Sequence, residues 1–117
     1  MTIGFSNNFG KIEIDDNVIS NLAVVSVMET YGVVGLASKN VKDGIYELLK
    51  MDNMQKGVKV TFLKKDEIDI DISLFIEYGV RIAVVAENII DKVKFNIENS
   101  LKIKVNSVNL YIQGIRK

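Results

Sequence analysis

The clearest pattern along the chain is a strict alternation of residue types from Ile68 to Tyr78, followed at Gly79 by a long amphipathic stretch. A period of two is typical of a β-strand with one covered face, because successive side chains point to opposite sides of the backbone. The face expected to be covered carries Ile68, Ile70, Ile72, Leu74, Ile76 and Tyr78. We expect the other face, with Asp69, Asp71, Ser73, Phe75 and Glu77, to be largely solvated.

The stretch after Gly79 predicts a long helix over 81–99. Its sheet-facing stripe is expected to contain Ile82, Val85, Ala86, Ile89, Val93 and Ile97. Val84 and Phe95 fall on the far side of this helix, nearly in line and about three turns apart. Aligned apolar residues on an outer helix face favour contact with another subunit.

An earlier helix is predicted over 16–31, with Asp15 as its capping residue. One stripe of this helix contains Val18, Ile19, Leu22 and Val25, whereas Val24, Val27 and Met28 lie around the other side. A helix that is apolar nearly all round needs two partners. One is the sheet, and the other is either the second helix or another subunit.

Together with the remaining segments, these elements predict a two-layer α+β sandwich. We expect a first strand over 9–14, a left-handed helix end at Gly32, and a short edge strand or extended linker over 33–37. Asp43 is expected to cap a short helix through residue 50, and 51–57 to form a polar connection. A strand over 58–63 pairs with the central strand as an antiparallel hairpin, and a last strand over 105–112 has an irregularity near Ser107. The predicted order is β-α-(short α)-β-β-α-β, with an antiparallel or mixed sheet and two main helices, in a single domain spanning 1–117.

The amino-acid composition restricts the possible chemical functions of the chain more than it restricts the fold. The 15 Lys and Arg balance the 15 Asp and Glu, which argues against nucleic acid and against adsorption to an anionic membrane. The chain has 0 His and 0 Cys, so the commonest general base, the thiolate nucleophile and the usual zinc ligands are missing. We expect no catalytic residue, no cofactor and no metal. The sequence shows no secretion signal and no apolar run of membrane-spanning length, which favours the cytoplasm.

Two motifs suggest chemistry but have simpler explanations. The acidic run Asp66, Glu67, Asp69 and Asp71 has the oxygen ligands of a calcium or magnesium site. Asp69, Asp71 and Glu77, which share one strand face, also resemble the carboxylate pairs of glycosidases. Because these acids alternate with apolar residues, a solvated strand face is the favoured interpretation. Gly32 and Gly35 match the two-glycine loop of nucleic-acid-binding KH domains, but valines fill the positions between them, so a helix end is favoured.

Several segments in a fixed order give the sequence a family resemblance. They are YGVVGLASKN, KDGIYELL, GVKV, the alternating strand ending in EYG, VAENIIDKVK and SVNLYIQGIR, which together cover about Gly10 to Arg116. The chain resembles the alkaline-shock and general-stress (Gls-type) protein family of Gram-positive bacteria, and within it the small YloU-like members.

The resemblance implies a small cytoplasmic α+β protein that is not an enzyme and that takes part in cell-envelope homeostasis and the stress response. It also implies self-association, and attachment to the inner face of the membrane through a separate anchor protein rather than by direct insertion. For the YloU-like branch it implies an alternative, which is a regulatory accessory of a lipid-metabolic kinase of the dihydroxyacetone or fatty-acid type, or of a fatty-acid biosynthetic enzyme.

The family motif positions fall into two sets. Gly32, Gly35, Asp43, Gly44, Tyr78, Gly79 and Gly114 have structural explanations, the glycines as backbone turns and Asp43 as a cap. Lys39, Asn40 and Gln113 are polar without an evident structural role, so we expect them to contact a partner, together with Val84 and Phe95. Where the family commonly has Ser or Pro followed by Glu at the start of the long helix, this chain has Ala83 and Val84, which removes a helix cap.

Overall fold

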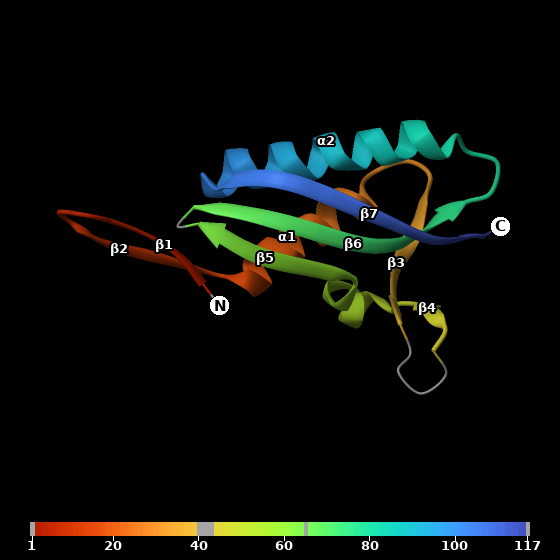
Figure 1. Cartoon of the computed structure of the whole chain (residues 1–117), viewed down its shortest axis with the longest axis horizontal. Helices are drawn as coiled ribbons and strands as arrows, with labels where there is room; N and C mark the ends of the chain where they lie inside the picture. The colour runs from red at the N-terminus through yellow and green to blue at the C-terminus, as the bar shows by residue number, and fades with distance from the viewer. Residues whose placement is uncertain (1, 40–43, 65, 117) are drawn as a thin grey trace.

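The computed structural model describes residues 2–39, 44–64 and 66–116. Its elements are, in chain order, β1 (Thr2–Asn7), β2 (Gly10–Asp15), α1 (Asp16–Met28), β3 (Val33–Lys39), β4 (Tyr46–Leu48), the 3-10 helix η1 (Met51–Gly57), β5 (Val58–Lys64), β6 (Glu67–Glu77), α2 (Ile82–Leu101) and β7 (Lys104–Arg116). Strands β3 to β7 form one mixed sheet, and α1 and α2 pack together against one side of it (Figure 1). The predicted α+β fold class is confirmed.

Strand β6 is central because three strands pair with it. β7 runs parallel to it along its whole length, β5 pairs antiparallel with its first half, and β3 pairs antiparallel with its second half. The register with β7 skips Asn106, which confirms the predicted irregularity near Ser107. A second irregularity, at Gln113, was not predicted. Helix α2 connects β6 to β7 and returns the chain to the starting end, as a parallel pair requires.

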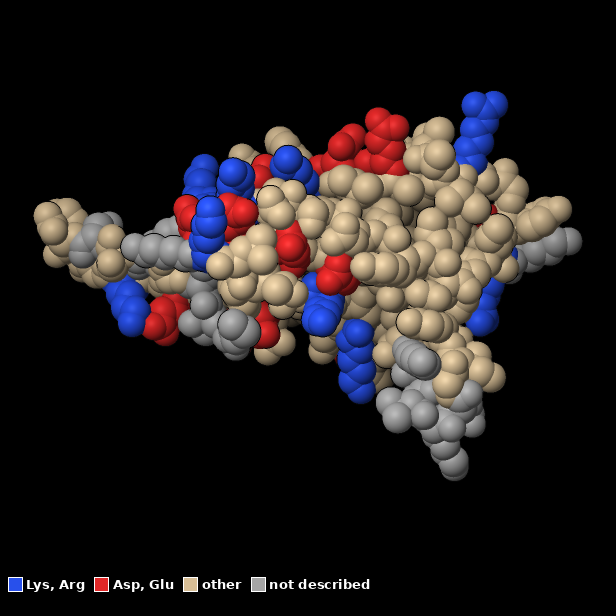
Figure 2. Space-filling model, viewed as in Figure 1, with Lys and Arg blue, Asp and Glu red and all other residues tan. Residues whose placement is uncertain are grey.

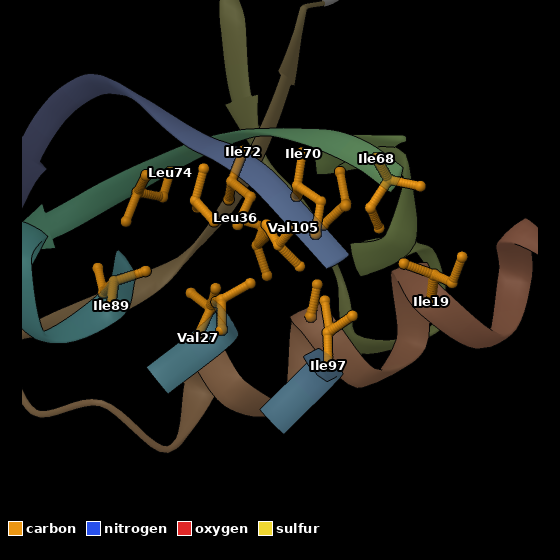
Figure 3. Close-up of a cluster of buried hydrophobic side chains, with 14 of the residues drawn as sticks. Ile19, Val27, Leu36, Ile68, Ile70, Ile72, Leu74, Ile89, Ile97 and Val105 are labelled. Atoms are coloured by element: carbon orange, nitrogen blue, oxygen red, sulfur yellow. The ribbon is translucent and has the colours of Figure 1, made fainter. Parts of the chain in front are cut away.

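The core lies between this sheet and the two helices, as Figure 3 shows. Ile68, Ile70, Ile72, Leu74 and Ile76 of β6 are fully buried, as predicted from the alternation. Phe75 was expected on the solvated face, but it is buried too, because its ring packs against Gly114 and beneath the Arg116 guanidinium. Val85, Ile89, Val93 and Ile97 of α2 are also buried, which confirms most of the predicted stripe, whereas Ile82 at the helix start is partly exposed. Tyr78 was placed on the covered face, but β6 ends at Glu77 and the Tyr78 side chain is exposed.

Helix α1 follows Asp15 as predicted, but the Asp15 side chain makes no capping hydrogen bond, and the helix ends at Met28 rather than Tyr31. The Thr30 hydroxyl donates to the Ser26 carbonyl at 3.0 Å, and Gly32 has the positive φ of 96° in the turn that follows. The predicted division of this helix into two apolar sides is wrong. The core face contains Ile19, Ala23, Ser26 and Val27, whereas Val18, Val25 and Met28 are exposed. Small polar residues share the core face because Ser26 satisfies its own hydroxyl within the helix, donating to the Leu22 carbonyl at 2.8 Å.

The segment between β3 and β5 differs most from expectation. The predicted short helix before residue 50 is replaced by strand β4, which pairs with β3 through Ala37–Leu48 and Lys39–Tyr46. The helical turn comes later, as η1, where a polar connection was expected. Residues 33–37 are neither an edge strand nor a linker, because β3 lies between β4 and β6. Asp43, the expected cap, lies outside the described residues.

The N-terminal strands form a separate hairpin. The predicted first strand corresponds to β2, and its antiparallel partner β1 was not predicted. The hairpin projects from one end of the molecule (Figure 1), and Phe9 in its turn is almost fully exposed.

Candidate interaction surface

The described residues contain no group of three or more side chains suited to holding a metal ion. The acids of β6 are instead bonded to β7: Asp69 accepts hydrogen bonds from the Ser107 hydroxyl at 2.7 Å and the Asn106 amide at 3.0 Å. These bonds, the one from Ser107 first, lower the pKa of Asp69 below its ordinary value. No helix in the described part of the chain is long and apolar enough to cross a membrane.

The outer surface of the helical layer exposes large apolar side chains from both helices. Two contacts define how α1 and α2 lie against each other: the Asn96 amide donates to the Ser26 hydroxyl at 2.8 Å, and Lys92 pairs with Glu29 at 3.3 Å. Residue numbers rise along α1 as they fall along α2, so the helices are antiparallel. Between them runs a seam, and the residues on its solvent side belong to both helices.

Val25 and Phe95 lie at the same level on the solvent side of this seam. Each directly precedes one partner of the Ser26–Asn96 hydrogen bond, and a step of about 100° turns both side chains outward. Val25 is 50% exposed and Phe95 is 66% exposed. An isolated exposed apolar residue is ordinary, but two at the same level of neighbouring helices place apolar surface on both sides of the seam.

A second apolar area lies near the start of α2. Val84, which is 49% exposed, lines a shallow hollow of about 270 Å³ together with Tyr31, Val80, Arg81 and Asn88. Tyr31 follows α1 and is 81% exposed. We call Val25, Phe95, Val84 and Tyr31 the seam patch, because they follow the outer side of the two helices.

The structure brings together only part of the predicted contact set. Val84 and Phe95 share the outer face of α2, as expected. Gln113 is half-buried in β7 at the second register shift. Lys39 ends β3 opposite Tyr46 of β4, and Figure 1 shows β4 at the edge of the sheet away from α2. Asn40 lies outside the described residues.

The motif glycines divide by physical role. Gly32, Gly44 and Gly79 have positive φ and act as the predicted backbone turns. Gly35 and Gly114 do not: they face each other across Phe75 of β6 and are needed for space. A Cβ at Gly114 would lie 3.0 Å from the Phe75 ring, and a Cβ at Gly35 would lie 2.9 Å from Leu48. Gly35 is therefore part of a paired strand, which rules out the two-glycine loop of a KH domain.

Sequence reasoning missed Val25 and Tyr31. Val25 was assigned to one of two apolar stripes of α1 without a choice of its partner, and Tyr31 was placed at the end of a helix that stops before it. Ser26 could have indicated the correct face, because a small polar side chain fits between two packed helices. With Ser26 on the buried side of α1, the neighbouring Val25 would have been predicted as exposed.

Comparison with known proteins relates nearly the whole chain to one protein family. The model of the alkaline shock protein 23 family, described by a cell envelope-related function, matches residues 4–117. The YloU protein of Bacillus subtilis is 38% identical over 99% of this chain and 97% of its own length. The Spy1614 protein of Streptococcus pyogenes is 39% identical over 99% of this chain and 96% of its own, and the YqhY protein of Bacillus subtilis is 32% identical over 93% and 79%. No solved structure matches the chain.

Proposed function

Because the chain belongs to the alkaline shock protein 23 family, which has a cell envelope-related function, we propose that it is a non-enzymatic, self-associating interaction module of envelope homeostasis that works in the cytoplasm. The single observation that carries the proposal is the seam patch, an apolar surface that extends over both helices. The chain contains 0 His and 0 Cys, so docking is better supported than bond-making.

The seam patch is suited to a second copy of the same helix. Val84 and Phe95 are eleven positions apart, or roughly 16 Å at 1.5 Å per residue. In an antiparallel pair related by a twofold axis, Val84 of one copy packs against Phe95 of the other, and the reverse contact forms at the same time. Each apolar residue then has an apolar partner.

The charges beside these residues favour the same arrangement. Glu87 and Asp91 lie in the first half of α2, whereas Lys94 lies in its second half. Figure 2 shows acidic groups over the middle of the helix, and basic groups mixed with acidic ones toward its C-terminal end. With the twofold axis midway between Val84 and Phe95, an antiparallel copy places Lys94 of one α2 near Glu87 of the other, which favours the antiparallel orientation over the parallel one.

Light scattering coupled to size exclusion tests the proposal on the full chain. We expect the wild-type chain to exceed the mass of a monomer at high micromolar concentration, and the double variant Val84→Glu, Phe95→Ser to be a monomer. Met51→Ser is the matched control, since Met51 is also strongly exposed but lies in η1, outside the seam patch.

Two results would count against this proposal. One is a wild-type chain that stays monomeric throughout this concentration range. The other is a double variant that associates as strongly as wild type while Met51→Ser disrupts the oligomer. Circular dichroism of each variant confirms that the folded state is retained.

A further inference from the structure

The sheet face opposite the helices contains a break in β6's pairing. The ladder to β5 ends at Ile72 and the ladder to β3 begins at Leu74, so Ser73 is paired on the β7 side, with Tyr111. At this point the chain leaves η1 through Gly57, whose Cα is so close to β3 that a Cβ would lie 2.9 Å from the Ala37 carbonyl oxygen. The backbone at Gly57 therefore lies against β3 beside the break in pairing. On the open face of the sheet, the break leaves a hollow.

This hollow has a volume of about 290 Å³ and combines several kinds of side chain. Its lining includes Tyr46, Lys56, Lys59, Asp71, Ser73 and Tyr111. The volume corresponds to about ten water molecules at roughly 30 Å³ each, which suits one small metabolite rather than a polymer. Figure 2 shows acidic and basic groups side by side over this part of the sheet.

The charged groups of the hollow are two lysines and one carboxylate, so the lining keeps a net positive charge although Lys59 lies opposite Asp71 in the β5–β6 ladder. Asp71 accepts a hydrogen bond from the Asn109 amide at 2.9 Å, and the same amide lies 3.3 Å from the Ser107 hydroxyl. This fixes one carboxylate oxygen, and a carboxylate has a second oxygen that accepts hydrogen bonds. The ion pairs of the described residues join Lys11 to Glu13 and Lys92 to Glu29, so neither Lys56 nor Lys59 belongs to one.

We propose that this hollow binds a phosphorylated sugar. Lys56 and Lys59 supply the positive charge that a phosphate requires. Asp71 and Ser73 supply an acceptor and a hydroxyl for the ring hydroxyl groups, and Tyr111, which is 50% exposed, supplies an aromatic face for the apolar side of the ring.

Simpler ligands match only part of the lining. Inorganic phosphate would use the lysines but would lie beside the Asp71 carboxylate and leave the tyrosine rings without a partner. A neutral sugar would use Asp71 and the rings but leave the net positive charge of two lysines and one carboxylate without an anion. A ligand with a hydroxylated ring at one end and a phosphate at the other satisfies both parts.

An NMR titration of the uniformly ¹⁵N-labelled full chain tests the site directly. The probes are glucose 6-phosphate, glucose 1-phosphate and ribose 5-phosphate, with glucose and inorganic phosphate as half-ligands. We expect saturable amide shifts over 57–60, 71–74 and 109–112 with at least one sugar phosphate, and binding of each half-ligand weaker by roughly tenfold or more.

Variants then show which side chains bind the phosphate end of the ligand and which bind the sugar end. Lys56→Ala with Lys59→Ala should remove sugar-phosphate binding, whereas Lys64→Ala on the same strand β5 should leave it unchanged. Tyr111→Leu should weaken binding of the sugar phosphate but not of inorganic phosphate.

Three results would overturn the assignment: the absence of saturable shifts with all three sugar phosphates, equal affinity for inorganic phosphate, or no effect of Tyr111→Leu. The outcome does not depend on self-association, because the hollow and the seam patch lie on opposite sides of the sheet. The double variant Val84→Glu, Phe95→Ser should therefore bind the probe as wild type does.

Discussion

Gly114 allows the sharpest prediction about stability. Its position in β7 faces Phe75 of β6, whose ring is buried and lies 4.5 Å below the Arg116 guanidinium. A Cβ added at residue 114 would meet two ring carbons at 3.0 and 3.1 Å. Carbon atoms in good contact are about 3.5–4.0 Å apart, so the ring must move by roughly 0.5 Å against its neighbours. Overpacking of this kind costs about 1–3 kcal/mol, and we expect Gly114→Ala to lose that much free energy of unfolding.

Urea denaturation followed by far-ultraviolet circular dichroism measures this loss, because the chain has 0 Trp for fluorescence. With a slope of about 1.5 kcal/mol/M, the urea midpoint should fall by roughly 0.7–2 M. Gly10→Ala is the control, since nothing lies within 4 Å of a Cβ there, and it should be neutral or slightly stabilising. The reasoning is refuted if the two variants behave alike, or if Gly114→Ala costs as much in a Phe75→Leu background as in wild type.

Three further changes test other parts of the structure. Arg81→Ser adds a capping hydroxyl where α2 has no side-chain cap and should raise the free energy of unfolding by about 1 kcal/mol; an unchanged thermal midpoint would contradict this. Ser26→Ala leaves the half-buried Asn96 amide without its 2.8 Å partner and should cost about 1–2 kcal/mol in urea, more than Lys92→Ala, which breaks an exposed ion pair. Ser107→Ala should raise the pKa of Asp69 toward its ordinary value in an NMR titration, because it removes the hydrogen bond that contributes most to lowering it. Since the folded-state pKa is lowered, Asp69 stabilises the fold above its unfolded pKa and that stabilisation disappears as the pH falls; the variant should lose less stability on acidification.

The parts of the fold that the sequence predicted are those where burial has a simple period. Ile68 to Leu74 alternate in burial, and Val85 to Ile97 repeat at helical spacing, so both elements and their core faces could be placed. Phe75 breaks the alternation, because it is buried on the opposite face of β6. Helix α1 was harder, because its apolar residues surround the helix and hydrophobicity alone does not select a face. The selection comes from the Ser26–Asn96 contact, whose partners are far apart in the sequence.

Long-range packing also explains the remaining errors. Tyr46 to Leu48 form a strand because β3 offers a free edge, which outweighs the local helical spacing. Gly35 and Gly114 resemble turn residues in the sequence, but their role is to leave room for side chains, Leu48 at Gly35 and the Phe75 ring at Gly114. For the candidate surface, Val84 and Phe95 could be predicted from one helix, whereas Val25 and Tyr31 required knowledge of how α1 lies beside α2.

Cysteine crosslinking at the seam patch tests the central claim most directly, because the natural chain has 0 Cys and one introduced thiol reports one contact. Asn88 lies between Val84 and Phe95 on the outer face of α2, close to the expected twofold axis. We predict that Asn88→Cys forms a disulfide-linked dimer under mild oxidation, and that Asn109→Cys on the open sheet face stays monomeric. Equal crosslinking of both variants, or crosslinking of Asn109→Cys alone, would contradict self-association through the helical layer.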